Sequence, residues 1–297
     1  MLPVCDPRTT SNTLGPMRVS IGDVKLFVDV DGAGLVVDGP AMREQPTLVM
    51  LHGGPGIDHT LFKQPLFAPL TRVAQVVYYD HRGNGRSDRG HPSDWNLDRW
   101  ADDVVALCDA LGIERPIVFG SSFGGFVALN YALRHPQHPG KLILSSTAAH
   151  IDFERSASMV EQLGGLEARH VFEAFWAGPT EETYAEYRRV CLPLYTQRPQ
   201  PPELSARMTR NLDVMAHFPR SGEMQFDYRD RLDSVRCPVL VMAGGLDPIV
   251  TIADARELAA ALPPSTTCLV EFPTAGHMLA FEDPEAVVPL MIDFIAS

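Results

Sequence analysis

Short apolar runs alternate along the chain with longer stretches in which apolar residues recur every three or four positions. The runs, bounded by Gly, Pro or polar residues, predict buried strands, and the longer spacing predicts helices that bury one face. Apolar residues at 97, 100, 104, 107 and 111 mark the clearest helix, which Gly112 ends. Strands that alternate with helices predict an α/β fold, with a mostly parallel central sheet flanked by helices. The predicted strands are Thr47 to Leu51, Val73 to Tyr79, Pro116 to Phe119, Lys141 to Ser145, Pro238 to Ala243 and Cys268 to Phe272.

The two ends of the chain depart from this alternation. Met17 to Ile21 and Lys25 to Val30 flank Gly22-Asp23 and predict a hairpin, and Asp31 to Gln45 is predicted to be an extended turn. Residues 1–16 are polar and rich in proline, which predicts a flexible leader. At the other end, Asp283 is predicted to cap a helix that Pro289 should kink or delay.

The strand pattern stops between about residues 147 and 233. Helix-forming residues and aromatics fill this segment, which a proline cluster near residue 200 interrupts. We expect an all-helical insertion. The chain then divides into a flexible leader (1–16), a core domain (17–146 and 234–297) and a helical cap domain (147–233).

Composition and charge narrow the class of protein. The 297 residues are 45% hydrophobic, which suits one large domain with its own core. The net charge of −12 argues against a nucleic-acid partner, because a polyanion would be repelled. No apolar run is long enough to span a membrane, and the N-terminus lacks the apolar core of a secretory signal. We therefore expect a cytoplasmic protein with no membrane partner, and these features leave its oligomeric state open.

The strongest chemical signal is the stretch Gly120-Ser121-Ser122-Phe123-Gly124-Gly125, between a predicted strand and a predicted helix. The pattern G-x-S-x-G at such a turn is typical of a nucleophile elbow. Its glycines let the backbone pack tightly, and its serine is strained and exposed above the sheet. Ser122 is therefore the predicted nucleophile.

A serine hydroxyl needs a base within hydrogen-bonding reach, and the base needs an acid that orients it. Asp247 follows one predicted strand in Gly-Gly-Leu-Asp-Pro, and His277 follows the next strand in Ala-Gly-His-Met. Both positions lie just past the carboxyl end of a strand, where ligands bind in open α/β sheets. The order Ser122, Asp247, His277 is also the order expected after such an elbow, so we predict that these residues form a catalytic triad.

Acyl transfer also needs N–H donors for the developing oxyanion. The amide of Phe123 and that of Gly54, in the loop His52-Gly53-Gly54-Pro55-Gly56, are predicted to form this oxyanion hole. The loop from Asp80 to Ser87 lacks the Lys-Ser/Thr pair of a phosphate-binding loop and is predicted to be structural, braced by its arginines. No cluster of His, Cys and carboxylates has metal-binding spacing, so we expect no metal and no cofactor.

Together, the His-Gly loop, the loop Tyr79 to Ser87 and the elbow resemble the corresponding motifs of the proline iminopeptidases, within the α/β-hydrolase superfamily. The resemblance covers nearly everything from Met17 to the C-terminus. It implies an α/β-hydrolase fold with a helical cap, and release of N-terminal residues from small peptides or aminoacyl amides. It also implies glutamates that bind the substrate's free amino group.

Glu173 and Glu223 are the candidates for those glutamates, and Gly53 and Trp176 are further predicted substrate-binding residues. Some family members carry a glutamate directly after the triad aspartate, where this chain has Pro248. Burying an ammonium group without a carboxylate partner is costly. A carboxylesterase or lactonase acting on small neutral esters is therefore the alternative.

A non-catalytic ligand receptor of the same fold is a third hypothesis. A dehalogenase or epoxide hydrolase is excluded, because either would need a carboxylate where this chain has Ser122. In every remaining case we expect the partner to be a small molecule or a short peptide.

Overall fold

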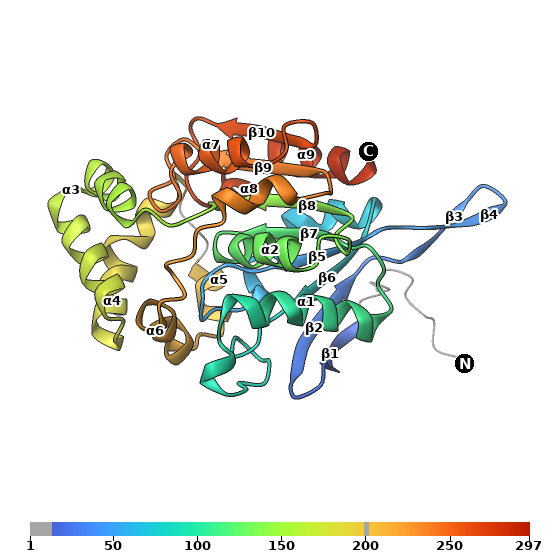
Figure 1. The fold of residues 1–297 in the computed structure, drawn as a ribbon, viewed down its shortest axis with the longest axis horizontal. Helices are drawn as coiled ribbons and strands as arrows, with labels where there is room; N and C mark the ends of the chain where they lie inside the picture. Colours follow the sequence, from blue (N-terminus) through green and yellow to red (C-terminus); the bar gives the residue numbers. More distant parts are fainter. Residues whose placement is uncertain (1–13, 199–201) are drawn as a thin grey trace, which may run out of the picture.

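A computed structural model describes residues 14–198 and 202–297. An eight-stranded sheet crosses the molecule with helices on both of its faces (Figure 1). The strand order is β1-β2-β6-β5-β7-β8-β9-β10. These strands are β1 (Leu14–Ser20), β2 (Lys25–Asp31), β5 (Thr47–Leu51), β6 (Gln75–Tyr79), β7 (Ile117–Ser121), β8 (Lys141–Ser145), β9 (Val239–Gly244) and β10 (Thr267–Phe272).

The strands from β5 to β10 pair in parallel, whereas β1 and β2 are antiparallel at one edge of the sheet. The predicted mostly parallel sheet and the predicted N-terminal hairpin are therefore confirmed. Parallel strands share one direction, so their carboxyl ends lie at the same edge of the sheet. The loops that follow β5, β7, β9 and β10 consequently meet there.

Helices cover the sheet as the apolar spacing predicts. Helix α1 starts after Asn96, whose side chain accepts from the amide of Arg99, and ends at Gly112, whose φ of 66° is left-handed. Helix α1 spans Leu97–Leu111. The other helices that flank the sheet are α2 (Phe123–Arg134), α7 (Ile252–Ala261), α8 (Leu279–Glu282) and α9 (Pro284–Ala296). Short 3₁₀ helices, η1 (His59–Leu61), η2 (Pro65–Arg72) and η3 (Pro92–Asp94), connect the strands.

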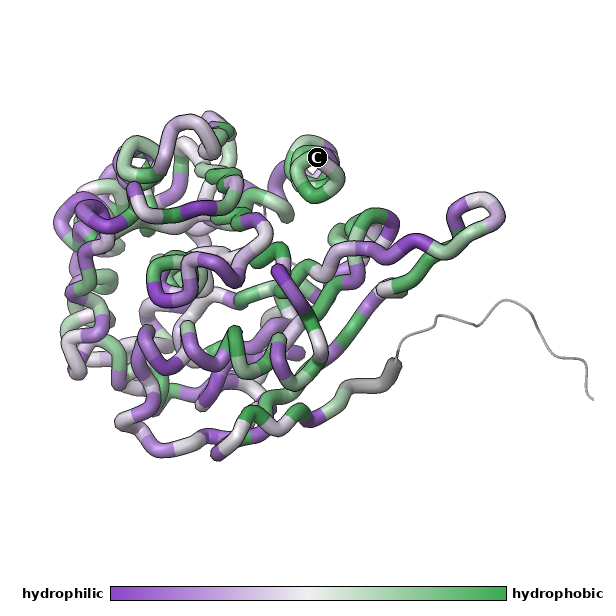
Figure 2. The backbone as a smooth tube through the Cα atoms, turned by 45° about the vertical axis from the view of Figure 1, so that its right-hand side comes forward, coloured by the Kyte–Doolittle hydropathy of each residue, from purple (hydrophilic) through white to green (hydrophobic). Residues whose placement is uncertain are grey.

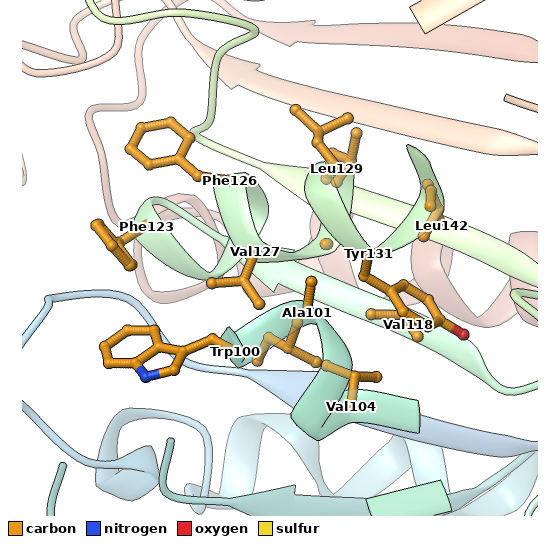
Figure 3. Packing of buried hydrophobic residues seen from close by; sticks show 14 of the residues in the cluster. Trp100, Ala101, Val104, Val118, Phe123, Phe126, Val127, Leu129, Tyr131 and Leu142 are labelled. Carbon is orange, nitrogen blue, oxygen red and sulfur yellow. The ribbon is translucent and has the colours of Figure 1, made fainter. Parts of the chain in front are cut away.

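The side chains of each central strand alternate between two apolar clusters. In β5, Val49 and Leu51 join the cluster that contains residues of α1 and α2, whereas Leu48 and Met50 join the cluster that contains residues of η2 and α9. Figure 3 shows the packing of α1 and α2 in the first cluster. Because both faces are covered, the strand sequences are continuously apolar and do not alternate with polar residues.

The predicted extended turn from Asp31 to Gln45 is wrong in part, because it contains a hairpin of β3 (Leu35–Asp38) and β4 (Ala41–Glu44). Figures 1 and 2 show this hairpin projecting from the body of the molecule. Leu35, Val37 and Met42 share one of its faces and are exposed. The strands are only four residues long, with Gly34 before them and Gly39-Pro40 between them, so their sequence pattern is that of a loop.

Helices also fill the described residues between β8 and β9, as predicted. They are α3 (Phe153–Ala177), α4 (Glu181–Val190), η4 (Leu192–Tyr195), α5 (Pro202–Arg207), α6 (Leu212–Ser221) and η5 (Arg229–Ser234). The β pairing described in this segment is one isolated bridge between His150 and Asp227. The division into a core and a cap domain at residues 147 and 233 stays a prediction.

Two predictions about the chain ends need revision. Strand β1 begins at Leu14, three residues before the predicted strand start at Met17, and residues 1–13 lie outside the described part of the chain. Helix α9 starts at Pro284 with Asp283 as its cap, as predicted, but it continues through Pro289. The predicted delay of that helix is therefore wrong. Across residues 14–198 and 202–297, none of the helices has the length and apolar character needed to cross a membrane.

The loop after β6 is braced by arginines, as predicted. Arg82 is fully buried and donates to Asp103 at 2.7 Å and to Asp23 at 2.7 Å. Arg86 donates through Nε to the buried carboxylate of Asp80 at 3.0 Å. Removing one partner of a buried ion pair leaves an uncompensated charge, so these pairs specify the loop conformation strongly.

These ion pairs predict that the protein loses stability in acid. The hydrogen bond from Arg82 lowers the pKa of Asp23 to about 2. Burial alone would raise the pKa of Asp80, but hydrogen bonds and charges from His59 and Arg86 outweigh burial and lower it. Both aspartates thus bind protons more weakly in the folded state than in the unfolded state, where their pKa is about 3.9. We expect the free energy of unfolding to fall progressively as the pH drops below about 4.

Urea denaturation between pH 6 and pH 2.5 measures this effect. Asp23→Asn should make the acid decline shallower, since one of the groups that takes up a proton on unfolding is gone. Asp230→Asn is the control, because no ion pair described for this chain involves Asp230. If the free energy of unfolding declined with equal slope in Asp23→Asn and the wild type, the lowered pKa given to Asp23 would be contradicted.

Candidate active site

Ser122 occupies a strained turn between β7 and α2. Its φ of 54° and ψ of −123° place a non-glycine residue in a backbone region that side chains rarely adopt. Two hydrogen bonds hold this turn: the Ser122 amide donates to the Ser145 carbonyl, and the Thr147 hydroxyl donates to the Ser122 carbonyl, both at 2.9 Å. The turn thus has the conformation that the sequence motif predicts.

The glycines of the motif are required by close backbone packing. A Cβ atom at Gly120 would lie 2.6 Å from the carbonyl oxygen of Gly124, and one at Gly124 would lie 2.6 Å from that of His52. Side chains do not tolerate such distances to backbone atoms. These contacts bring the His-Gly loop after β5 against the start of α2, directly beside Ser122.

His277 and Asp247 lie on the loops after the neighbouring parallel strands β10 and β9. The Nδ1–H of His277 donates to Oδ2 of Asp247 at 2.7 Å. The other carboxylate oxygen of Asp247 accepts from the amides of Ile249 and Val250, at 2.8 and 2.9 Å. Asp247 is fully buried, and these bonds fix the orientation of its carboxylate toward the imidazole.

Ser122 and His277 line the same cavity, whose volume is about 700 Å³. Asp247 lies behind His277 and does not line the cavity. The structure therefore brings the three predicted residues to the carboxyl edge of the sheet, although 155 residues separate Ser122 from His277 in the sequence. Their catalytic roles stay a prediction.

Gly53, Gly54 and Phe123 also line this cavity. A Cβ atom at Gly53 would lie 3.2 Å from the Cβ of Ser122, so the His-Gly loop passes close to the serine. Phe123 is the first residue of α2 and directly follows Ser122. The amides of Gly54 and Phe123 thus belong to two segments that meet at the serine, as an oxyanion hole requires, and this role stays a prediction.

His52 holds the His-Gly loop from behind. Burial lowers the pKa of His52, which favours a neutral ring. Its Nδ1–H donates to the carbonyl of Gly53 at 2.7 Å, and its Nε2 accepts from the amide of His81 at 3.1 Å. The amide of Gly56 donates in turn to Asn84 at 2.7 Å. The loop after β6 therefore supports the glycines that border the cavity.

A family model described as the alpha/beta hydrolase fold matches residues 46–284, which is more than half of the chain. This chain belongs to the α/β-hydrolase family. The relatives and structural neighbours include proline iminopeptidases, so the resemblance stated from the sequence is confirmed.

Three of the matches illustrate the range of relatives. The chain is 30% identical to a provisionally named carbamate hydrolase, RutD, of Caulobacter sp. strain K31, over 90% of this chain and 97% of that protein. It is 26% identical to the proline iminopeptidase PfmaB of Pestalotiopsis fici, over 88% and 96%. The proline iminopeptidase of Mycobacterium smegmatis matches with a TM-score of 0.69 at 24% identity, over 95% and 97%, and this likeness supports the fold alone.

The substrate-binding residues predicted for this α/β-hydrolase are only partly brought together. Trp176 lines the cavity beside Phe172 and Phe175 of the same helix. Glu223 does not line it, because its carboxylate accepts from the amide of Leu97 at the start of α1. That amide has no partner within its own helix, so an acidic side chain is well placed there. The predicted substrate-binding role of Glu223 therefore disagrees with its position.

Glu173, the other candidate glutamate, is about half exposed and forms an ion pair with Arg169 on α3. It does not line the cavity that contains Ser122. Within the described part of the chain, no group of three or more His, Cys, Asp or Glu side chains is arranged to hold a metal ion.

Two residues that support His277 in this α/β-hydrolase escaped the sequence prediction. The carbonyl of Tyr195, on η4, accepts from the His277 amide at 2.7 Å, and its ring lies against the imidazole with centroids 5.0 Å apart. Glu282 is buried and accepts from the amides of Gly276 and Gln197, at 3.0 and 2.9 Å. Helices between β8 and β9 thus contact the histidine loop directly, and no local motif marks these long-range contacts.

Proposed function

We propose that this α/β-hydrolase is a serine hydrolase that forms an acyl-enzyme on Ser122. The observation that carries the proposal is the cavity that Ser122, strained at the elbow, shares with His277, which is hydrogen-bonded to a buried and oriented Asp247. An unpaired serine in a turn would need neither an imidazole nor a carboxylate aligned behind it. The hydrolase relatives support this class of activity and do not favour a ligand receptor.

The proposed reaction follows from which nitrogen of His277 is already used. Nδ1 donates to Asp247, so Nε2 is the nitrogen that accepts the proton from the Ser122 hydroxyl. The serine oxygen bonds to the substrate carbonyl carbon, and the amides of Gly54 and Phe123 stabilise the oxyanion that forms. When the leaving group departs, it takes the proton from His277. A water molecule, deprotonated by His277, then cleaves the ester bond to Ser122 and regenerates the serine.

For the substrate, the cavity favours an acyl compound without an ammonium group. Its walls are mostly apolar and aromatic, and among the described residues the carboxylates that line it are Asp152 and Asp254. Both of these carboxylates contact Arg155, which also pairs with Glu257, so each already has an arginine partner. A free amino terminus would have to share one of these carboxylates with Arg155, and an ammonium group without a carboxylate of its own is costly to bury. We propose a carboxylic ester or amide as the substrate class.

A proline iminopeptidase-like activity is the second candidate, favoured by similarity to PfmaB over 273 aligned residues. The two candidates differ in what they require at the substrate's amino end. We expect turnover of p-nitrophenyl acetate and butyrate, with proline naphthylamide turned over no faster than its N-acetylated form. Turnover of proline naphthylamide that N-acetylation abolishes, without ester hydrolysis, would support the aminopeptidase instead.

A further inference from the structure

We propose that Arg188 and Arg210 form an anion-binding subsite in the cavity, which selects substrates that carry a carboxylate at the end remote from the scissile bond. This proposal rests on the serine hydrolase function and deepens it by naming the substrate class. Both arginines line the cavity that contains Ser122, and both contact Tyr184, which lines it too. The guanidinium of Arg188 lies over the Tyr184 ring, 5.9 Å from its centroid. The Nε–H of Arg210 donates to the Tyr184 hydroxyl at 3.1 Å.

The two arginines come from different parts of the chain. Arg188 is in the last turn of α4, and Arg210 precedes α6, so the subsite joins two helices of the segment between β8 and β9. Arg188 is exposed and yet lines the cavity, which places it where the cavity meets solvent. A charged substrate end bound there could remain partly hydrated while the apolar chain enters toward Ser122.

The carboxylates and the arginines that line the cavity have different partners. Asp152 accepts from the Arg155 amide at 3.0 Å as the cap of α3, and its carboxylate lies 3.6 Å from the Arg155 guanidinium. Asp254 is buried, accepts from Thr251 and forms an ion pair with Arg155. Arg155 does not line the cavity. Both carboxylates of the wall are therefore held by Arg155, which they share with Glu257, whereas the contact described for Arg188 is with the ring of Tyr184.

Within residues 14–198 and 202–297, Arg188 forms none of the described ion pairs, in contrast to its neighbour Arg189. Arg189 donates to Glu186 at 2.8 Å and to Glu167 at 3.0 Å, and it does not line the cavity. If both side chains simply extended into solvent from α4, these neighbouring arginines would have similar partners. A guanidinium can donate two parallel hydrogen bonds to a carboxylate, and the apolar cavity beside it strengthens such bonds. A chain that carries an ester at one end and a carboxylate at the other fits this arrangement.

The test compares two p-nitrophenyl esters of the same diacid that differ in charge: mono-p-nitrophenyl adipate and its methyl ester. We expect the wild type to hydrolyse the free acid with a kcat/KM about 10-fold higher, the size of one charge-assisted hydrogen bond. Arg188→Gln and Arg210→Gln should each lower kcat/KM for the acid about 10-fold and leave the methyl ester within about 2-fold. Arg189→Gln should change neither substrate. Equal loss on both esters, or no preference in the wild type, would overturn the subsite and leave the serine hydrolase intact.

A binding measurement distinguishes failure of the proposed anion subsite from failure of the proposed serine hydrolase reaction. Calorimetric titration of Ser122→Ala with monomethyl adipate, which keeps one free carboxylate, measures recognition without turnover. We expect binding that weakens about 10-fold in the double variant with Arg188→Gln and is unchanged by Arg189→Gln. If neither ester is hydrolysed, this binding still supports the anion subsite while the proposed hydrolysis fails. Equal affinity with and without Arg188 would overturn the subsite.

Discussion

Replacing Ser122 by alanine is expected to lower kcat for ester hydrolysis by roughly 10⁵- to 10⁶-fold, because the attacking oxygen is lost. The fold should persist, since the Ser122 amide donates to the Ser145 carbonyl and the Thr147 hydroxyl donates to the Ser122 carbonyl, and neither bond uses the serine hydroxyl. Steady-state kinetics with p-nitrophenyl butyrate measure the loss, and circular dichroism with thermal unfolding measures the fold.

Ser121→Ala is the matched control for this substitution. Ser121 lines the same cavity and is the neighbouring residue, but it ends β7 and does not occupy the strained turn. We expect its kcat to stay within about 10-fold of the wild type, as for a residue that only borders the site. Retention of wild-type turnover by Ser122→Ala, or an equally deep loss in Ser121→Ala, would contradict the role given to Ser122.

Replacing Asp247 by asparagine is expected to lower kcat about 10⁴-fold with little loss of structure. The oxygen that accepts from the amides of Ile249 and Val250 must stay an acceptor, so the new NH₂ group has to face Nδ1 of His277. Nδ1 must then accept a hydrogen bond, which moves the proton to Nε2. An imidazole protonated at Nε2 cannot take the proton from Ser122.

Asp152→Asn is the control for this second substitution. Asp152 also borders the cavity, but as the cap of α3, and an asparagine oxygen can accept the same amide hydrogen bond from Arg155. Kinetics of both variants with p-nitrophenyl butyrate, together with thermal unfolding, make the comparison. Asp247→Asn activity close to that of Asp152→Asn would mean that Asp247 does not set the histidine tautomer.

Local sequence patterns predicted much of this molecule. The central strands are buried on both faces, so their continuous apolar runs could be recognised without the fold. The elbow could be recognised because its glycines are required by close backbone contacts between one strand and the helix that follows it. The contact between Gly120 and Gly124 is an example. Asp247 and His277 were predictable because parallel strands bring their carboxyl ends to a single edge.

Features that depend on how helices dock were not predictable in the same way. Glu223 has the charge that a substrate ammonium would need, but the docking of α6 near α1 gives it an amide partner instead. Arg188 and Arg189 are adjacent and chemically identical, and only the packing of α4 decides which one borders the cavity. The hairpin of β3 and β4 was missed because its strands are short and bury no continuous face.

Reaction with a fluorophosphonate, followed by mass spectrometry of the peptides, tests the proposed nucleophile most directly. Such probes phosphonylate a serine only when a neighbouring base activates its hydroxyl. We expect one adduct, on Ser122, in the wild-type protein and none in Ser122→Ala. An unlabelled protein, or an adduct on Ser121 that persists in Ser122→Ala, would contradict the serine hydrolase mechanism.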